Sequence, residues 1–248
     1  MSQAHRVIVI TGAGGTLGAA LSQQFASEPE TDVVLSDVSA RSLAATVDAL
    51  SEPRNAVEML VADVGEIAEV EAVVGLAVER FGRLDVLISN AGVLAPNGRI
   101  HNLATEDWER AFRVNVLGAV NGIRAAVPIM RAQQSGSIIL TASVAGLTAW
   151  SHAAPYCATK AAVIQLAKVA AVEYARDGIR VNCVCPGTFL SGIHDDLPQE
   201  AVDAIAARHP LGLGAAADLV GAYSYLASDA SRWTTGSAIV VDGGYAAP

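Results

Sequence analysis

Two side chains with titratable groups, Tyr156 and Lys160, stand one helical turn apart in a segment that favours a helix. Positions i and i+4 of a helix share one face, so the phenol and the ammonium group would project together. Ser143, which follows an apolar run typical of a strand, precedes the tyrosine by thirteen residues. Such a trio could exchange a proton with a bound ligand and polarise one of its oxygen atoms. The alternative is an ordinary pair on a helix surface.

A glycine-rich run, Thr11–Gly18, joins the first apolar run of the chain to a helical segment. Its glycines follow the spacing GxxGxxG, and such a turn lets the backbone approach a pyrophosphate closely. The amino end of the following helix offers N–H donors and a favourable dipole to phosphate. We expect a nucleotide to contact Gly12, Gly15, Thr16, Leu17 and Gly18. A plain turn is the alternative, and the strand–turn–helix context argues against it.

One carboxylate, Asp37, ends the second expected strand nineteen residues after Gly18. A carboxylate at this place can accept hydrogen bonds from both ribose hydroxyls of NAD and would repel the 2′-phosphate of NADP. Its neighbours Ser36 and Val38 are uncharged, so no adjacent basic side chain neutralises a phosphate. NAD is therefore the expected cofactor. A helix-capping role for the same residue is compatible with this reading.

Short strands and alanine-rich helices alternate along the whole chain. Strands are expected at 6–10, 31–36, 57–62, 84–89, 136–142, 180–185 and 237–241, and helices at 17–27, 40–50, 67–81, 108–130, 156–175 and 216–227. Connections of crossover length predict a doubly wound α/β Rossmann fold, with a seven-stranded parallel sheet covered by helices on both faces. No linker interrupts this pattern, so we expect one domain over residues 1–248. The irregular segment 188–213 is the expected substrate lid.

The composition excludes several classes of protein. A formal net charge of −9 argues against a nucleic-acid or anionic-membrane surface. No apolar run reaches a membrane span of about twenty residues and no signal-peptide pattern is present, so we expect a cytoplasmic protein. Cys157, Cys183 and Cys185 lack a CxxC pattern and indicate a reducing compartment. The histidines are scattered, so no metal site is expected.

Further motifs make essentially the whole chain resemble the short-chain dehydrogenase/reductase family. They are Asp63-Val64 after the third strand, Asn90-Ala91-Gly92 after the fourth, Asn115 in the long helix, Pro186-Gly187 after the sixth strand and the closing Val241-Asp242-Gly243-Gly244. The resemblance implies an oxidoreductase that moves a hydride between a nicotinamide cofactor and an alcohol or ketone. It also implies a catalytic tetrad, formed by Asn115, Ser143, Tyr156 and Lys160.

The resemblance assigns a role to each of these residues. Tyr156 would be the general acid/base, and Lys160 would lower its pKa and bind the nicotinamide ribose. Ser143 would polarise the carbonyl, and Asn115 would hold a water behind Lys160. Cofactor contacts would also come from Asp63, Val64, Asn90, Ala91, Gly92, Pro186, Gly187, the Phe189 backbone and Ser191. Members of the family are commonly homotetramers, and the small residues of 161–171 would suit a helix interface.

Three positions depart from the usual pattern of the family. Thr16 stands where glycine is commonest, Ser89 replaces the first asparagine of Asn-Asn-Ala-Gly, and Ser191 replaces a threonine while keeping the hydroxyl. These changes leave the four tetrad residues in place, and they affect the details of how the cofactor is contacted.

The substrate pocket is expected to be mostly apolar, which suggests a hydrophobic or modest-sized secondary alcohol. Its expected lining is Leu94, Val144, Ala145, Trp150, His152, Thr188, Phe189 and Ile193. Asp195 and Asp196 are interpreted as solvated lid charges. An NADPH-dependent reductase of 3-oxoacyl chains on a carrier protein is the alternative enzyme, and Asp37 and the acidic surface speak against it. A nucleotide-sensing protein without activity is disfavoured because all four tetrad positions are present.

Overall fold

Parallel strands form the centre of the molecule. The computed structural model describes residues 5–51, 53–191 and 198–247. In this part of the chain one seven-stranded sheet has the order β3-β2-β1-β4-β5-β6-β7, with every pair parallel. The strands are β1 (Arg6–Thr11), β2 (Thr31–Asp37), β3 (Val57–Val61), β4 (Val86–Ser89), β5 (Gly136–Thr141), β6 (Ile179–Pro186) and β7 (Ala238–Val241). The strand order reverses between β1 and β4, where sheets of this kind bind ligands beyond their carboxyl ends.

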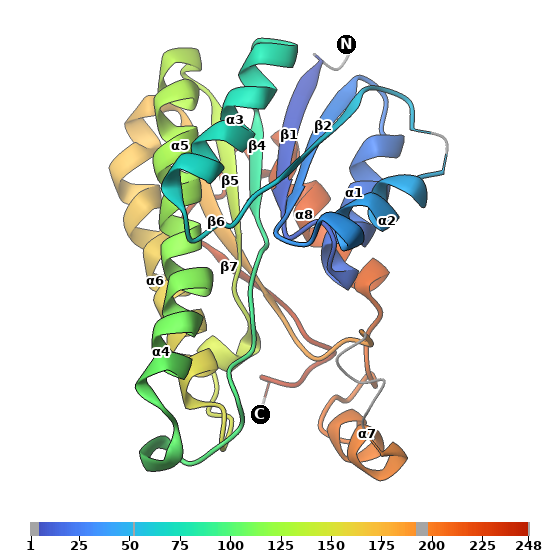
Figure 1. Cartoon of the computed structure of the whole chain (residues 1–248), viewed down its shortest axis with the longest axis vertical. Coiled ribbons are helices and arrows are strands. Elements are labelled where there is room, and N and C mark those ends of the chain that lie inside the picture. Colours follow the sequence, from blue (N-terminus) through green and yellow to red (C-terminus); the bar gives the residue numbers. More distant parts are fainter. Residues whose placement is uncertain (1–4, 52, 192–197, 248) are drawn as a thin grey trace.

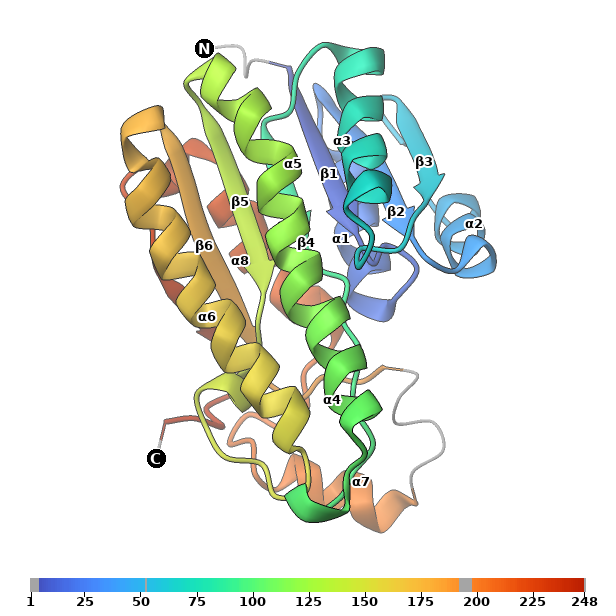
Figure 2. The same ribbon diagram turned by 60° about the vertical axis from the view of Figure 1, so that its left-hand side comes forward.

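Helices cover both faces of the sheet, which confirms the doubly wound fold expected from the sequence (Figure 1). One face carries α3 (Ile67–Phe81), α5 (Gly118–Gln133) and α6 (Ala154–Tyr174). The other face carries α1 (Thr16–Ser27), α2 (Ala40–Asp48) and α8 (Ala216–Ala227). Figure 2 shows α4 (Thr105–Phe112) continuing the line of α5 beyond the sheet, toward the end where α7 (Gln199–Ala206) lies.

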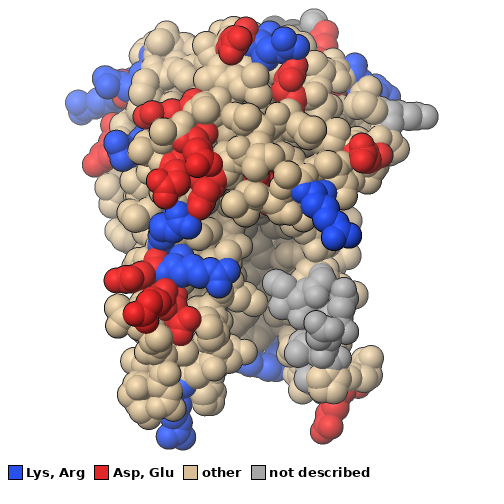
Figure 3. All heavy atoms as spheres, viewed as in Figure 1, with Lys and Arg blue, Asp and Glu red and all other residues tan. Residues whose placement is uncertain are grey.

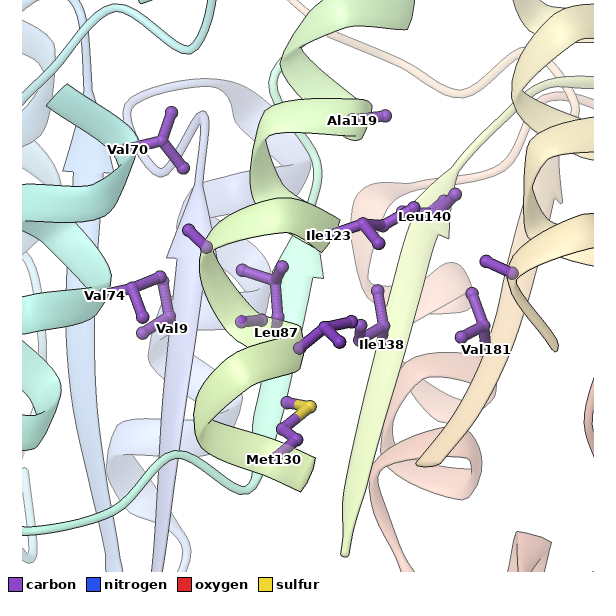
Figure 4. Close-up of a cluster of buried hydrophobic side chains, with 14 of the residues drawn as sticks. Val9, Val70, Val74, Leu87, Ala119, Ile123, Met130, Ile138, Leu140 and Val181 are labelled. Carbon is purple, nitrogen blue, oxygen red and sulfur yellow. The ribbon is translucent and has the colours of Figure 1, made fainter. Parts of the chain in front are cut away.

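Two apolar cores result from this arrangement, because parallel strands are buried on both faces. Figure 4 shows the core beneath α3 and α5, where Val74 lies beside Val9, and Ile123 and Met130 lie near Leu87 and Ile138 of the sheet. The second core holds side chains of β1 and β2 against α1 and α8, with Phe25 and Tyr223 fully buried. Because the sheet is covered on both sides, its strand ends are held rigidly. The residues that directly follow the strands are therefore fixed in position.

The long helix expected at 108–130 differs in its course. It begins at Thr105, where Asp107 accepts a hydrogen bond from the backbone N–H of Ala104, and it ends at Gln133. A π-helical stretch, Arg113–Leu117, separates α4 from α5 and contains Asn115. Single-turn π segments inside helices are frequent at functional sites. Hydrophobic periodicity does not report such an insertion, so the sequence predicted an uninterrupted helix.

The helix that carries Tyr156 and Lys160 begins two residues earlier than expected, at Ala154. Pro155 lies in its first turn, where a missing N–H is tolerated and a fixed φ favours the helix. The two candidate residues therefore occupy the first two turns of α6, next to the carboxyl ends of β5 and β6. Lys160 packs against β5 there, since its Nζ donates to the carbonyl of Thr141 at 2.8 Å.

Candidate active site

A cavity of about 580 Å³ opens beyond the carboxyl ends of the strands. Figure 3 shows this end of the molecule as a hollow between two lobes, one carrying α4 and the other α7. Ser143, Tyr156 and Lys160 all line the cavity, although they come from different segments of the chain. The other expected residues on its wall are Leu17, Asn90, Gly92, Pro186, Gly187, Phe189 and Ser191.

Ser143 is held two residues beyond the end of β5. Its hydroxyl oxygen accepts from the backbone N–H of Ala145 at 3.1 Å and lies 3.5 Å from the carbonyl of Pro186. These contacts fix the side chain at the start of a 3-10 turn, Val144–Gly146. Only 4% of Ser143 is exposed, so the hydroxyl is both buried and oriented.

Tyr156 lines the same cavity as Ser143, and its phenol interacts with the Ser143 hydroxyl. Burial raises the pKa of Tyr156 above its usual value, and the nearby Ser143 hydroxyl acts in the opposite direction. The indole of Trp150 stacks on the phenol ring, with ring centroids 6.2 Å apart and planes inclined by 29°. The phenol is thus fixed between a hydroxyl and an aromatic wall. Protonated at neutral pH, it can donate a proton to a ligand oxygen.

Lys160 lies one turn further along α6 and is 4% exposed. Its Nζ donates to the carbonyl of Thr141 and lies 5.6 Å from the centroid of the Tyr156 ring. Burial lowers the pKa of Lys160 to about 8, because a buried ammonium group loses its hydration. An ammonium group has three donors, so two remain for a ligand or for water. The backbone also approaches closely here, since a Cβ on Gly92 would lie 3.2 Å from Nζ.

Asn115 lies behind this pair, in the π-helical stretch. Its Oδ1 accepts from the backbone N–H of Val93 at 2.8 Å, and its Nδ2 donates to the carbonyl of Val93 at 3.0 Å. Nδ2 also donates to Oγ1 of Thr159 at 3.0 Å, so both amide hydrogens are engaged. The side chain therefore fastens the segment after β4 to α6, while a second lone pair on Oδ1 is available to a water.

The glycine turn after β1 has the shape that a pyrophosphate requires. Gly12 has φ +66°, and a Cβ there would lie 2.7 Å from the Cα of Ala91. A Cβ on Gly18 would lie 2.0 Å from the carbonyl oxygen of Gly12, which fixes how closely α1 approaches the turn. Gly15 is exposed and caps α1 without a side-chain hydrogen bond, so the N–H groups of the first turn are not covered by a capping side chain. The cradle fits a dinucleotide, with Thr16 and Leu17 in the first turn of the helix.

Asp37 closes the turn on its outer side. Its Oδ2 accepts from the backbone N–H of Gly14 at 2.9 Å, and its Oδ1 accepts from that of Ser39 at 2.8 Å. Each carboxylate oxygen keeps a further lone pair for a ribose hydroxyl. No ion pair of the described residues includes Asp37. The backbone thus orients the carboxylate, and no ion pair of the described residues neutralises its negative charge.

Asn90 connects the glycine turn to the neighbouring strands. Its Nδ2 donates to the carbonyls of Thr11 and Gly12, at 3.2 and 3.1 Å, and its Oδ1 accepts from Oγ1 of Thr141. Ala91 packs against the turn, as the contact of Gly12 shows. Asn90 therefore stabilises the glycine turn through its hydrogen bonds and also forms part of the cavity wall.

Asp63 has a partner that the motifs did not indicate. Arg113 donates to its Oδ2 at 2.8 Å and also reaches Glu66, while the backbone N–H of Gly65 donates to Oδ1. Burial acts to raise the pKa of Asp63, but the Gly65 and Arg113 bonds outweigh it and lower the pKa. Val64, 8% exposed, packs against α5 beside this pair. A basic residue on a π-helical turn fifty positions away carries no local signal, so the sequence could not pair it with Asp63.

The expected pocket lining needs correction at three positions. Val144 and Ala145 are buried in the turn after Ser143 and do not line the cavity, and His152 is exposed with φ +67° and bonds to Ser151. A loop has no regular repeat of apolar and polar residues, so its sequence does not show which side chains face the cavity. Leu94, Trp150, Thr188 and Phe189 do line the cavity. Ile193, Asp195 and Asp196 lie outside the described residues.

Several lining residues were not anticipated from the sequence. They include Asn97, Ile205, Arg208 and Tyr245. Arg208 follows α7 and Tyr245 follows β7, so both belong to segments whose course depends on tertiary packing. Thr188–Leu190 is tied to Gly214, because Leu190 N donates to the Gly214 carbonyl at 2.8 Å. The two ends of the expected lid segment therefore lie side by side.

The cysteines and histidines form no metal site among the described residues. Cys183 and Cys185 are 1% and 0% exposed and belong to the core beneath α5 and α6. None of the described helices is long and apolar enough to cross a membrane.

Comparisons with known proteins agree with this geometry. A family model described as enoyl-(acyl carrier protein) reductase matches residues 12–246. Cis-4-hydroxycyclohexanecarboxylate dehydrogenase of Sinomonas cyclohexanicum is 36% identical to this chain over 98% of both proteins. The chain belongs to the short-chain dehydrogenase/reductase family. Another member, a 3-oxoacyl-[acyl-carrier-protein] reductase of Thermotoga maritima, is 35% identical over 96% of this chain and 97% of its own.

Solved structures of the family superimpose closely. Levodione reductase matches with a TM-score of 0.92 and 31% identity, over 98% of both chains. A structure of NAD⁺-bound xylitol dehydrogenase also matches with a TM-score of 0.92, at 27% identity, over 98% of this chain and all of that chain. These relatives are oxidoreductases acting on hydroxyl or carbonyl groups, so the short-chain dehydrogenase/reductase described here is an oxidoreductase that requires a nicotinamide cofactor.

Proposed function

We propose that this protein is an NAD-dependent dehydrogenase that interconverts a secondary alcohol and a ketone. The observation that carries the proposal is that Ser143 and Tyr156 line one cavity together, with Lys160 one turn further along the helix of Tyr156. Two oriented hydroxyls on one wall of a cavity are the arrangement needed to hold a carbinol or carbonyl oxygen. The bound nicotinamide would supply the hydride acceptor or donor.

Each residue then has a definite task. In the oxidative direction the phenol oxygen of Tyr156 would receive the hydroxyl proton of the substrate, and in the reductive direction it would return that proton. Ser143 would hold the same substrate oxygen by hydrogen bonding. The ammonium group of Lys160 would favour the deprotonated form of Tyr156 and offer its remaining donors to the nicotinamide ribose. Asn115 would position a water that connects Lys160 to solvent.

Cofactor choice is proposed from Asp37. Its carboxylate is oriented by Gly14 and Ser39 and is not paired with a cation. Two like charges about 4 Å apart interact by about 4 kcal/mol at an effective dielectric of 20, and solvent reduces this at an exposed rim. We expect NAD to be preferred over NADP by one to three orders of magnitude in kcat/KM. The remaining cofactor contacts would come from the glycine turn, Asp63, Val64, Asn90–Gly92 and Pro186–Ser191.

A second function is favoured by the similarity to 3-oxoacyl-[acyl-carrier-protein] reductase. That reading is an NADPH-dependent reductase of acyl chains on a carrier protein. The two readings are separated by cofactor titration of the wild-type protein, followed by fluorescence of NADH and NADPH. Tight NADH binding with weak NADPH binding supports the dehydrogenase, and the reverse result supports the reductase. Turnover of a panel of secondary alcohols with NAD would then establish the reaction.

The cellular setting completes the proposal. The fold would act as one catalytic domain, with 188–213 closing over the substrate. Small residues in 161–171 of α6 would pack against a second copy in a homotetramer. A cytoplasmic location would match the cysteine content and the acidic surface. The partner in each catalytic cycle would be a small molecule, with no role for nucleic acid or membrane.

A further inference from the structure

A cationic side chain, Arg208, stands on the wall of the active-site cavity at the end of α7. Its guanidinium lies over the ring of Tyr245, 4.8 Å from the ring centroid, and Nη2 donates to the Tyr245 hydroxyl. No ion pair of the described residues includes Arg208. A guanidinium has five N–H donors in a planar fork, so most of them remain for a ligand.

The position of Arg208 is separated from the reacting groups by aromatic rings. The Trp150 indole stacks on Tyr156 and also meets the edge of Tyr245, with ring centroids 6.1 Å apart. The order along the wall is therefore Tyr156, Trp150, Tyr245 and Arg208. Trp150 and Tyr245 present apolar ring surface between a proton donor and a cation. Such a wall suits a substrate whose apolar body lies between a hydroxyl group and an acid group.

A cation here is distinctive because the molecule as a whole repels anions. The formal net charge is −9, so an anionic ligand gains nothing from the general field of the protein. In Figure 3, acidic side chains lie on the outer side of the lobe that carries α4 and at the tip of the lobe that carries α7, while basic atoms are visible in the hollow between the lobes. A single guanidinium that is stacked and hydrogen-bonded is already oriented, so it loses less conformational freedom when it binds a ligand.

We propose that Arg208, held by Tyr245, binds a carboxylate of the substrate at the end of the cavity remote from Tyr156. The inference rests on the proposed function and narrows its substrate class. The substrate is a secondary alcohol that carries a carboxylate several bonds from its carbinol carbon. A 2-hydroxy acid is excluded by the same geometry, because its carboxylate adjoins the reacting carbon and could not pass two aromatic rings to reach Arg208.

Binding tests this inference without turnover. Calorimetric titrations of the protein saturated with NADH would compare cyclohexanecarboxylate with cyclohexanecarboxamide, which has the same shape and no charge. We expect the acid to bind at least tenfold more tightly than the amide. Arg208→Gln should weaken binding of the acid about 10- to 100-fold, the range for hydrogen bonds to charged groups, and should leave the amide unchanged. Arg208→Lys should restore part of the loss, because it keeps the charge without the fork.

A matched control is Arg232→Gln, which removes an exposed arginine beside a second cavity, at the amino ends of the strands. It should not affect either ligand. Equal binding of acid and amide to the wild-type protein would overturn the inference, and so would equal weakening of both ligands by Arg208→Gln. Weaker NADH binding in Arg208→Gln would assign the guanidinium to the cofactor and would also overturn it.

Kinetics then separate failure of the inference from failure of the proposed function. The probes are 4-hydroxycyclohexanecarboxylate and cyclohexanol, assayed with NAD. Arg208→Gln should raise KM for the hydroxy acid at least tenfold and leave cyclohexanol within about twofold. If both probes are oxidised and the variant treats them alike, the proposed function stands and the role of Arg208 is wrong. If the acid binds through Arg208 and neither probe is oxidised, the anion site stands and the proposed reaction is wrong.

Discussion

The backbone N–H of Thr188 donates to Nε2 of His209 at 3.1 Å, and Nδ1 of the same ring lies 2.9 Å from the carbonyl of Ile205. A backbone N–H only donates and a carbonyl only accepts, so the imidazole is neutral with its proton on Nδ1. His209 is 4% exposed, and its ring lies 4.8 Å from that of Tyr245. One buried side chain thus joins the segment after β6, the end of α7 and the C-terminal turn.

Replacing this imidazole should loosen the wall of the cavity at Thr188. His209→Phe keeps an aromatic ring and leaves the Thr188 N–H without its acceptor, whereas the Ile205 carbonyl still accepts from the backbone N–H of Arg208. An unsatisfied buried polar group costs about 1–3 kcal/mol, so we expect amide hydrogen exchange at Thr188 to accelerate about tenfold or more. Mass spectrometry of peptides covering 187–190 would measure it. His101→Phe changes an exposed histidine and serves as the control; unchanged exchange in His209→Phe would contradict the role of the bond.

Removing the phenol hydroxyl should stop the chemistry and spare the cofactor site. Tyr156→Phe keeps the stacking with Trp150 and removes the group proposed to move the proton. Acid–base catalysis contributes about 10²–10⁴-fold, so kcat should fall by that factor while the NADH dissociation constant changes by less than about threefold. Steady-state kinetics and fluorescence titration would measure the two effects. Tyr225→Phe, which removes an exposed hydroxyl bonded to Thr234, is the control. Residual activity above about a tenth of wild type would contradict the assignment.

The sheet could be predicted from the sequence because its determinants are local. Apolar runs such as 6–10 and 31–36 are short, rich in valine and isoleucine, and bounded by turn residues, so each strand is marked by its own residues. Right-handed crossovers then give the doubly wound architecture, whereas the order of the strands was not predicted. The π-helical stretch around Asn115 could not be predicted, because it inserts one residue into a helical pattern without changing the residue types. Its observed contacts, with Val93 and Thr159, are all made outside its own helix.

Within the site, the residues that could be predicted are those whose partners lie close to them in the sequence. Tyr156 and Lys160 are on adjacent turns, and the glycine turn is continuous, so spacing alone places their members together. Arg208 and Tyr245 reach the cavity through α7 and the chain after β7, whose courses depend on contacts with distant residues. The sequence therefore indicated the reaction better than the substrate, and it described the pocket as apolar where the structure adds a guanidinium.

The cofactor preference should depend on the charge of Asp37 more than on its shape. Asp37→Asn keeps an acceptor for Gly14 or Ser39 and removes the charge, whereas Asp37→Ser also removes the acceptor that reaches the turn. Both variants should improve the KM for NADP, by about tenfold or more, since the repulsion of the 2′-phosphate is lost. Asp37→Ser should in addition weaken the binding of NAD, because the hydrogen bond that Asp37 accepts from Gly14 is lost. Kinetic constants with both cofactors would measure this; an unchanged NADP constant in Asp37→Asn would assign the preference elsewhere.

The buried ammonium group of Lys160 should make stability depend on pH in the alkaline range. Burial lowers its pKa from 10.5 to about 8. A folded-state pKa below the unfolded one means that the unfolded chain binds more protons between these values, so stability rises as pH increases from about 8 to 10.5.

Below pH 8 the cost of burying the charge is fully present, about 3 kcal/mol from the size of the shift, and above pH 10.5 it is absent. Lys160→Met removes this cost and also leaves the Thr141 carbonyl without its donor, a loss of about 1 kcal/mol at any pH. We therefore expect the variant to be more stable than wild type at pH 7.5 and to lose that advantage by pH 10.5. Urea unfolding at both pH values would measure the difference. Lys168→Met, which replaces the other lysine of the chain at an exposed position on the same helix, should show no such trend. A difference between Lys160→Met and wild type that stays constant with pH would show that Lys160 keeps an ordinary pKa in the folded protein.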